Sequence, residues 1–350
     1  MSASKPRSTV ATRMSGIRED WLAKTREEIL EPDLAIVDPH HHLWDFPTHR
    51  YLLPDLLADT GSGHNIESTV FIECTACYRA GGPPELRTLG ETEFVNGIAA
   101  MSASGAYGAT RAAAGIVGLV DLTLGGAAED VLRAHMATAG PRFKGIRYAA
   151  AWEDKADEIH NSHTDAPPHL YRDHAKFREG FAALGRLGLT FDAWLYHPQI
   201  ADLTHLARAF PGQPIVLDHV GGPLGLGWYA DKRDEIFAGW KRDMVELATC
   251  PNVYIKLGGL GMRVNGFKFH HRELPPSSKE LADAWRPYIE TCIEAFGPAR
   301  CMFESNFPVD KISGSYAIYW NVFKRLASGA SAADKAALFH DTAKRFYRLG

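Results

Sequence analysis

The stretch LAIVDPHHH, at residues 34–42, joins a short apolar run to a polar C-terminal end. Short apolar runs of this kind, bounded by turn-forming or polar residues, are typical of buried β-strands. The same pattern recurs seven more times, at residues 68–75, 115–123, 143–150, 189–197, 214–222, 252–259 and 300–307. The stretch is therefore predicted to be the first of eight strands that each end in polar side chains.

Segments with a helical period lie between several of these strands. An apolar side chain recurs every four residues within 232–250, and residues 176–188 carry a similar apolar stripe. Residues 277–297 open with Ser277 and Glu280 at the spacing of a capping box and close on a glycine. Strands that alternate with helices of this length form a parallel sheet.

Eight such units predict an α/β fold of the (β/α)8 TIM barrel type. A doubly wound open sheet is the alternative, but it needs fewer strands, and no Gly-rich phosphate loop follows any strand here. Residues 1–33 are expected to form an N-terminal leader and a short helix outside the barrel. Residues 34–350 are expected to form a single barrel domain, because no linker divides them.

The composition excludes several kinds of partner. The 350 residues are 45% hydrophobic and carry a formal net charge of -4, with both signs mixed along the chain. No basic stripe indicates nucleic acid, and no apolar run approaches the ~18 residues that a membrane span needs. Five scattered cysteines fit a reducing compartment. We expect a cytoplasmic protein that acts on a small molecule, and a homodimer is a common outcome for such folds.

The three adjacent histidines do not form one site if they lie on a strand. Side chains alternate between the two faces of a strand, so Asp38, His40 and His42 are expected on one face and His41 on the other. Two imidazoles two residues apart can converge on one ion or one substrate oxygen. Taken alone, the pair can equally consist of polar, hydrogen-bonded histidines.

Other strand ends carry polar residues that would meet at the same end of the barrel. His219 is expected to share a face with Ile215 and Leu217, and Glu304 is expected to share one with Asn306. The remaining strand ends contribute His197, Arg147 and Lys256. Because the active sites of TIM barrels lie at the carboxyl ends of the strands, this ring of residues predicts a functional pocket.

The chain resembles the amidohydrolase-related (amidohydrolase 2) family in three motifs. These are D-x-H-H-H-L-W-D at the first strand, LDHVGGP at the sixth and M-F-x-S-N-F-P-V-D at the eighth. The resemblance extends from about residue 34 to the C-terminal AKRFYRL and is strongest to the branch of sugar-acid and dicarboxylate lactonases. It implies a (β/α)8 barrel that hydrolyses C–O or C–N bonds, although some relatives decarboxylate their substrates.

The resemblance also implies roles for individual residues. His40, His42 and His219 would bind a divalent metal or polarise the substrate. Asn306 stands where the family has an Asp that binds metal or accepts a proton from water, and an amide cannot take up that proton. Glu304 can take over as base or as a fourth metal ligand, unless it is a buried acid paired with Arg or Lys. Asp310 is a second candidate base.

The fourth strand limits the expected metal content. Dinuclear relatives place a carbamylated Lys or a Glu there, whereas this strand carries Lys144 and Arg147. We therefore expect at most one divalent metal, Zn²⁺ or Mn²⁺, and the alternative of none stays open. The missing Asp favours a lactone or ester over an amide, because esters need weaker activation.

Several residues are candidates for binding the substrate. Arg147 suits bidentate capture of a substrate carboxylate, and its alternative is an ion pair with Glu73 or Asp121. Tyr148, His197, Phe267 and His271 are further candidates, the last two in a long loop after the seventh strand.

The leading functional hypothesis is hydrolysis of a lactone or related cyclic ester that carries a carboxylate, either at one metal ion or at a carbonyl polarised by histidine. A non-oxidative decarboxylase of an aromatic or unsaturated acid is the alternative within the enzymes. The alternative outside them is a catalytically inactive barrel that binds a small ligand.

Overall fold

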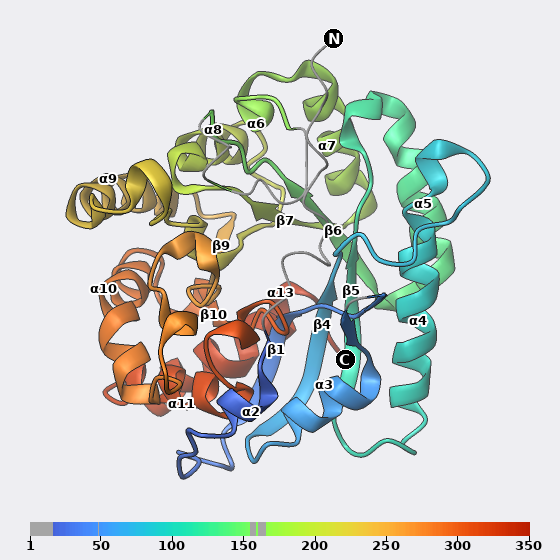
Figure 1. Cartoon of the computed structure of the whole chain (residues 1–350). Coiled ribbons are helices and arrows are strands. Elements are labelled where there is room, and N and C mark those ends of the chain that lie inside the picture. Colours follow the sequence, from blue (N-terminus) through green and yellow to red (C-terminus); the bar gives the residue numbers. More distant parts are fainter. Residues whose placement is uncertain (1–16, 48, 155–158, 160–165) are drawn as a thin grey trace.

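Eight parallel strands form the centre of the structure (Figure 1). The computed structural model describes residues 17–47, 49–154, 159 and 166–350. The strands are hydrogen-bonded in the order β1-β4-β5-β6-β7-β8-β9-β10. Their bounds are Ala35–His41, Asn65–Ile72, Arg111–Gly118, Phe143–Ala149, Thr190–Trp194, Ile215–Leu217, Val253–Leu257 and Cys301–Phe303. All eight predicted strands are present, and the prediction of a TIM barrel is confirmed.

Backbone hydrogen bonds beyond the end of β10 join the last strand to the first. The His42 amide donates to the Phe307 carbonyl over 2.8 Å, and the Asn306 amide donates to the His40 carbonyl over 2.9 Å. A parallel bridge between His41 and Phe307 lies between these two bonds. The barrel therefore closes at the same residues that were expected to carry its chemistry.

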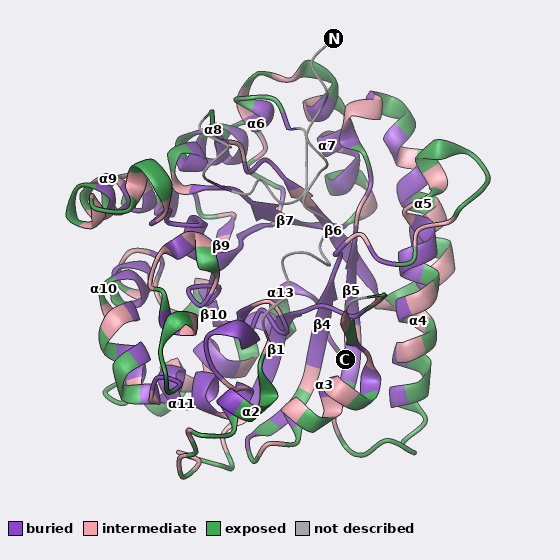
Figure 2. Ribbon diagram, viewed as in Figure 1, coloured by how far each residue is buried: buried purple, intermediate pink, exposed green. Residues whose placement is uncertain are grey.

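Helices surround the strands and turn their buried faces inward (Figure 2). They are α2 (Glu19–Leu22), α3 (Leu53–Thr60), α4 (Leu89–Ala103), α5 (Ala128–Ala139), α6 (Leu170–Asp173), α7 (Ala175–Leu187), α8 (Ile200–Ala209), α9 (Arg233–Ala248), α10 (Ser278–Phe296), α11 (Tyr316–Leu326), α12 (Ala332–Ala336) and α13 (Thr342–Phe346). A two-stranded hairpin, β2 (Trp44–Phe46) and β3 (His49–Tyr51), follows β1. The three predicted helices correspond to α7, α9 and α10. Ser277 and Glu280 form the expected capping box.

The C-terminal segment fills one end of the barrel. Valines from β1, β4, β5 and β8 and a methionine from β10 form a buried cluster with Phe346 and Tyr347. Lys144, at the start of β6, donates to the Arg348 carbonyl over 3.0 Å. Since β6 starts at this end, the segment closes the amino end of the barrel and leaves the carboxyl ends of the strands for the polar cluster.

The short N-terminal helix packs outside the barrel, against the loop between β9 and α10. The Trp21 indole donates to the Arg272 carbonyl over 3.0 Å. The expected leader lies largely outside the described residues, which begin at residue 17. Among the described residues, no helix is long and apolar enough to cross a membrane.

A buried carboxyl group supports the loop after β4. Glu91, on α4, accepts hydrogen bonds from the amides of Cys74 and Ala76 over 3.0 and 2.8 Å. Burial, reinforced by the nearby Glu73, raises the pKa of Glu91 to about 8. The folded protein therefore holds a proton on Glu91 that the unfolded chain releases above its ordinary pKa of 4.5.

This shift predicts a pH-dependent loss of stability that Glu91→Gln removes. The free energy of unfolding of the wild type should fall between about pH 4.5 and about pH 8, by an amount on the order of a few kcal/mol. Glutamine has no proton to lose, so the variant should show a flatter profile in chemical denaturation. Glu93→Gln, at an exposed site on the same helix, is the control and should retain the wild-type slope. Equal slopes for the wild type and Glu91→Gln would contradict the prediction.

Candidate active site

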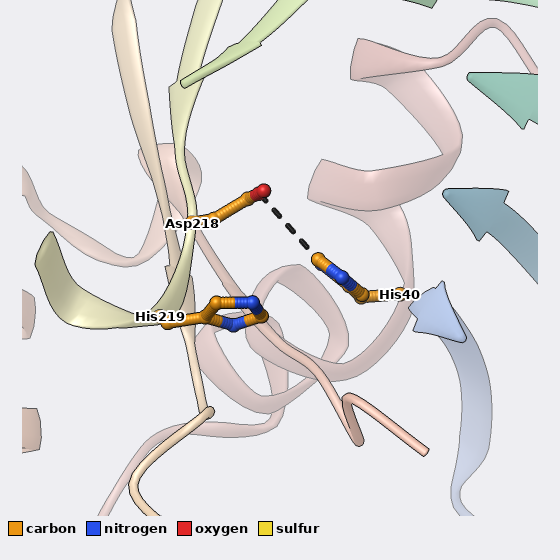
Figure 3. Close-up of side chains that lie close together, drawn as sticks. All are labelled: His40, Asp218 and His219. Carbon is orange, nitrogen blue, oxygen red and sulfur yellow. Dashed lines mark ion pairs between the residues drawn. The ribbon is translucent and has the colours of Figure 1, made fainter. Parts of the chain in front are cut away.

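Polar side chains from several strands meet at the carboxyl end of the barrel. His40 comes from β1, Asp218 and His219 follow β8, and Glu304 follows β10. These four residues are at most 2% exposed. The rings of His40 and His219 have centroids 4.4 Å apart, and Figure 3 shows Asp218 pointing toward His40 beside them. The expected convergence of β1, β8 and β10 at this end of the barrel is present.

A bulge in β1 directs the His40 side chain toward the cluster. Asp38 pairs with Thr69 and His41 pairs with Phe71, so three steps along β1 match two steps along β4. An extra residue of this kind shifts the alternation of side chains. The expectation that Asp38 shares a face with His40 is therefore wrong. Asp38 instead accepts hydrogen bonds from Ser305 Oγ over 2.6 Å and Tyr316 Oη over 2.9 Å.

His41 lies on the other face, as predicted. Its Nε2 is 2.8 Å from Thr69 Oγ1, and its ring packs edge-on against Phe71. Burial lowers the pKa of His41 to about 3. His41 is thus a neutral, hydrogen-bonded histidine that stands apart from the cluster.

His219 reaches the cluster by a different backbone path from the one that strand alternation predicts. Ile215 and Leu217 face the helices, whereas Val216 faces the barrel interior and Asp218 continues on that interior face. His219 follows with φ of 56°, a left-handed conformation that ends the strand and folds its ring back beside His40. Strand alternation therefore placed His219 on the wrong face, and Asp218 was missed although its two-residue spacing from Val216 could have identified it.

Glu304 holds His219 in one orientation. Its Oε1 accepts hydrogen bonds from the His219 amide over 3.0 Å and from His219 Nδ1 over 2.7 Å. Burial opposes its ionisation, but His219 and His40 lower the pKa of Glu304 to about 2. Because Nδ1–H donates to this carboxylate, His219 Nε2 keeps its lone pair and can accept a proton.

Two buried cations stand behind His40. Lys256 Nζ lies 2.7 Å from Asp192 Oδ2, 3.0 Å from Asp218 Oδ1 and 3.1 Å from His40 Nδ1. Despite burial, the two carboxylates raise the pKa of Lys256. Burial and the Lys256 charge in turn hold the pKa of His40 well below its ordinary value, so His40 is neutral.

Arg147 forms the ion pair that the sequence left as an alternative to substrate binding. Its Nε donates to Glu73 Oε1 over 2.8 Å, and a second bond runs from its Nη2 to the Glu73 carbonyl. Its Nη1 lies 3.5 Å from His40 Nε2. The guanidinium is therefore committed to protein partners and does not present a free fork to a substrate carboxylate.

Asn306 links His42 to a second buried acid. His42 Nδ1 donates to the Ile72 carbonyl over 2.8 Å, and His42 Nε2 lies 3.3 Å from Asn306 Oδ1. Asn306 Nδ2 donates to Asp310 Oδ1 over 2.9 Å, and burial raises the pKa of Asp310 well above its ordinary value. Asn306 thus joins His42 to a buried carboxyl group through two side-chain contacts.

The residue types of the cluster suit a divalent cation. His40, Asp218 and His219 each offer one donor atom, and these atoms lie within 4.8 Å of one another. Imidazole and carboxylate are ligands that Zn²⁺ and Mn²⁺ accept. Glu304, an expected ligand, instead bonds to His219, and the third expected histidine, His42, faces Asn306.

The contacts of His40 do not fit such an ion. Its Nδ1 lies between Glu304 Oε2, at 2.8 Å, and the Lys256 ammonium. Its Nε2 faces the Arg147 guanidinium. Whichever ring nitrogen carries the proton, the other one faces a protein cation, so neither offers a free lone pair to a metal.

Two of the expected substrate-binding residues point away from the cluster. Tyr148 donates from its hydroxyl to Asp121 Oδ1 over 3.1 Å and packs edge-on against Phe177 of α7. His197 accepts from the Leu224 amide over 3.2 Å and lines a separate pocket beside α9. Tyr148 neighbours Arg147 in sequence but lies on the opposite face of β6.

The expected aromatic group in the loop after β9 is packed against helices. Phe267 stacks on Phe269, meets Tyr288 of α10 edge-on and lies under the Arg233 guanidinium. His271 is exposed and contacts its neighbour His270. Within the described residues, this group makes its contacts with α9, with α10 and with its own loop rather than with the histidine cluster.

The chain matches known proteins over most of its length. The profile of the amidohydrolase family, described as "Amidohydrolase", matches residues 37–349. The chain is 34% identical over 349 residues to the uncharacterised protein y4mH of Sinorhizobium fredii, covering 91% of this chain and 99% of that protein. It is 28% identical over 331 residues to an L-fucono-1,5-lactonase of Burkholderia multivorans, covering 89% and 96%.

The fold itself is also found among solved structures. An amidohydrolase from Burkholderia multivorans, crystallised with bound zinc, superposes with a TM-score of 0.70. The match covers 90% of this chain and 100% of that chain at 24% sequence identity. At this level of identity the likeness bears on the barrel and not on the ligands of the site.

Asn306→Asp should destabilise the protein, and exchange with Asp310 should restore it. The single substitution places a carboxyl group against Asp310 and removes the amide donor between them. We expect it to lower the free energy of unfolding by about 1–3 kcal/mol in chemical denaturation. The double variant Asn306→Asp/Asp310→Asn rebuilds an amide–carboxyl pair and should recover most of the loss. An unchanged single variant would contradict this account, because Asp tolerates the left-handed φ of 55° as Asn does.

Proposed function

The chain belongs to the amidohydrolase family, and from this premise we propose that it is a hydrolase that opens a lactone. The observation that carries the proposal is the His219–Glu304 pair, a histidine oriented by a buried carboxylate beside two fixed cations. The relative from Burkholderia multivorans that is named L-fucono-1,5-lactonase supports the choice of a lactone.

In the proposed reaction His219 activates water. Its Nε2 accepts a proton from the water whose oxygen attacks the lactone carbonyl carbon. The carbonyl oxygen then carries negative charge, which the field of Lys256 and Arg147 beside His40 stabilises. When the intermediate collapses, the bond from the carbonyl carbon to the ring oxygen breaks, and His219 returns the proton to that oxygen. The product is the open-chain hydroxy acid.

The contacts of Arg147 change the expected substrate. A substrate carboxylate would need a free cationic fork, and Arg147 spends two of its donors on Glu73. Lys256 is likewise paired, with Asp192 and Asp218. We therefore propose a neutral, hydroxylated lactone in place of the carboxylate-bearing substrate first expected.

No step of this proposal passes through a metal ion. A divalent metal at this site would polarise the carbonyl and lower the pKa of bound water. In the proposed reaction, Lys256 and Arg147 stabilise the charge on the carbonyl oxygen, and His219 activates the water.

The test is a panel of neutral and carboxylated lactones, followed by proton release. Neutral hydroxylated lactones should give the highest kcat/KM. Carbon dioxide release from aromatic or unsaturated acids is measured in parallel, because it would replace the proposal with decarboxylation. Ligand binding without turnover on either panel would indicate an inactive barrel.

Glu304→Gln and His219→Asn should each lower kcat on the best lactone by about 10²–10⁴-fold, since each removes the oriented base. Glu294→Gln, the same chemical change at an exposed site on α10, should leave kcat unchanged. Retention of full activity by Glu304→Gln would remove the pair from the mechanism.

A further inference from the structure

We propose that Arg147 and Lys256 form a fixed cation pair that takes the place of a divalent metal at His40 and keeps such an ion out. The inference extends the proposed function, because it assigns the charge that stabilises the reaction to two side chains. It depends on contacts within the barrel and does not depend on which substrate is used.

The two cations reach His40 from opposite sides. Lys256 Nζ is 3.1 Å from the Nδ1 atom and Arg147 Nη1 is 3.5 Å from the Nε2 atom. A divalent ion bound to either nitrogen would lie within a few ångströms of a like charge in a buried site, where repulsion is weakly screened. Together the two side chains carry the charge of one divalent ion.

Two buried carboxylates hold Lys256 in this position, and a tyrosine hydroxyl holds one of them. Asp192 Oδ2 accepts from Lys256 Nζ over 2.7 Å and from the Tyr347 hydroxyl over 2.6 Å. Asp218 Oδ1 lies 3.0 Å from the ammonium on the other side. Lys256, Tyr347 and the two carboxylates are fully buried. The C-terminal segment thus helps to fix a charge that lies at the reactive end of the barrel.

Asp218 is the potential metal ligand whose carboxylate is occupied by the Lys256 ammonium. Neither of its carboxylate oxygens makes a hydrogen bond to the residues that the structure describes. Its nearest polar neighbours are the cations Lys256, at 3.0 Å, and Arg147, at 3.8 Å, and the neutral His40, whose Nδ1 lies at 3.7 Å. Removal of Lys256 would leave this buried carboxylate facing two imidazoles, which is a metal-ligand set.

The test compares Zn²⁺ binding by the full-length wild type and by Lys256→Met/Asp192→Asn. The second substitution removes one of the two carboxylates paired with Lys256, so the double variant loses one positive and one negative charge and keeps the net charge of the cluster unchanged. Zn²⁺ alone is the probe, with metal content measured after dialysis and affinity measured by calorimetry. We expect the double variant to bind one equivalent at least about tenfold more tightly than the wild type.

Two control variants locate the ion. Lys256→Arg keeps the positive charge and should gain no affinity. Asp218→Asn, added to the double variant, should abolish the gain, because it removes the carboxylate donor. Circular dichroism checks that each variant is folded.

Two results would overturn the proposal. One is a folded double variant that binds Zn²⁺ no better than the wild type. The other is a wild-type protein that holds one tightly bound equivalent which Asp218→Asn removes, and this measurement needs no Lys256 variant. Neither result involves a lactone, so the absence of lactone turnover would count against the proposed function and leave this inference standing.

Discussion

The Lys256 ammonium is the interaction on which the polar interior of this barrel depends. It lies between carboxylates of two neighbouring strands, Asp192 of β7 and Asp218 beyond β8, which would otherwise repel each other. Charges buried this deeply are tolerated only when they are paired. The pairing also sets the state of His40, whose protonation the adjacent ammonium disfavours. Stability of the barrel and reactivity of its histidines therefore rest on the same ion pairs.

Much of the fold could be predicted from the sequence, because the hydrophobic pattern reports burial directly. Eight apolar runs became eight strands, and Ser277 with Glu280 marked the start of α10. The face of each strand was predicted less well. Pro39 lies within a bulge that moved Asp38 away from His40, and left-handed backbone after Asp218 turned His219 inward. Such local breaks leave no trace in a two-residue alternation.

The sequence also did not determine which residues the charged side chains pair with. The sequence offered Arg147 either a substrate or a carboxylate of the chain, and the choice depends on Glu73, which is 74 residues away. At residue 306 an amide stands where the resemblance led us to expect an acid, and the neighbouring Glu304 and Asp310 bond to other side chains of the site. Glu304 supports His219, and Asp310 bonds to Asn306. The sequence identified these residues, but only the folded chain shows which of them pair.

The pairing of the first and last strands determines when the candidate site is completed during folding. His40 and His42 use their own backbone groups to bind Asn306 and Phe307. The barrel is thus closed by hydrogen bonds between residues near the start of the domain and residues near its end. Until these bonds form, the histidines lack both their neighbours and their enclosure. The candidate site is therefore complete only once the first and last strands have paired.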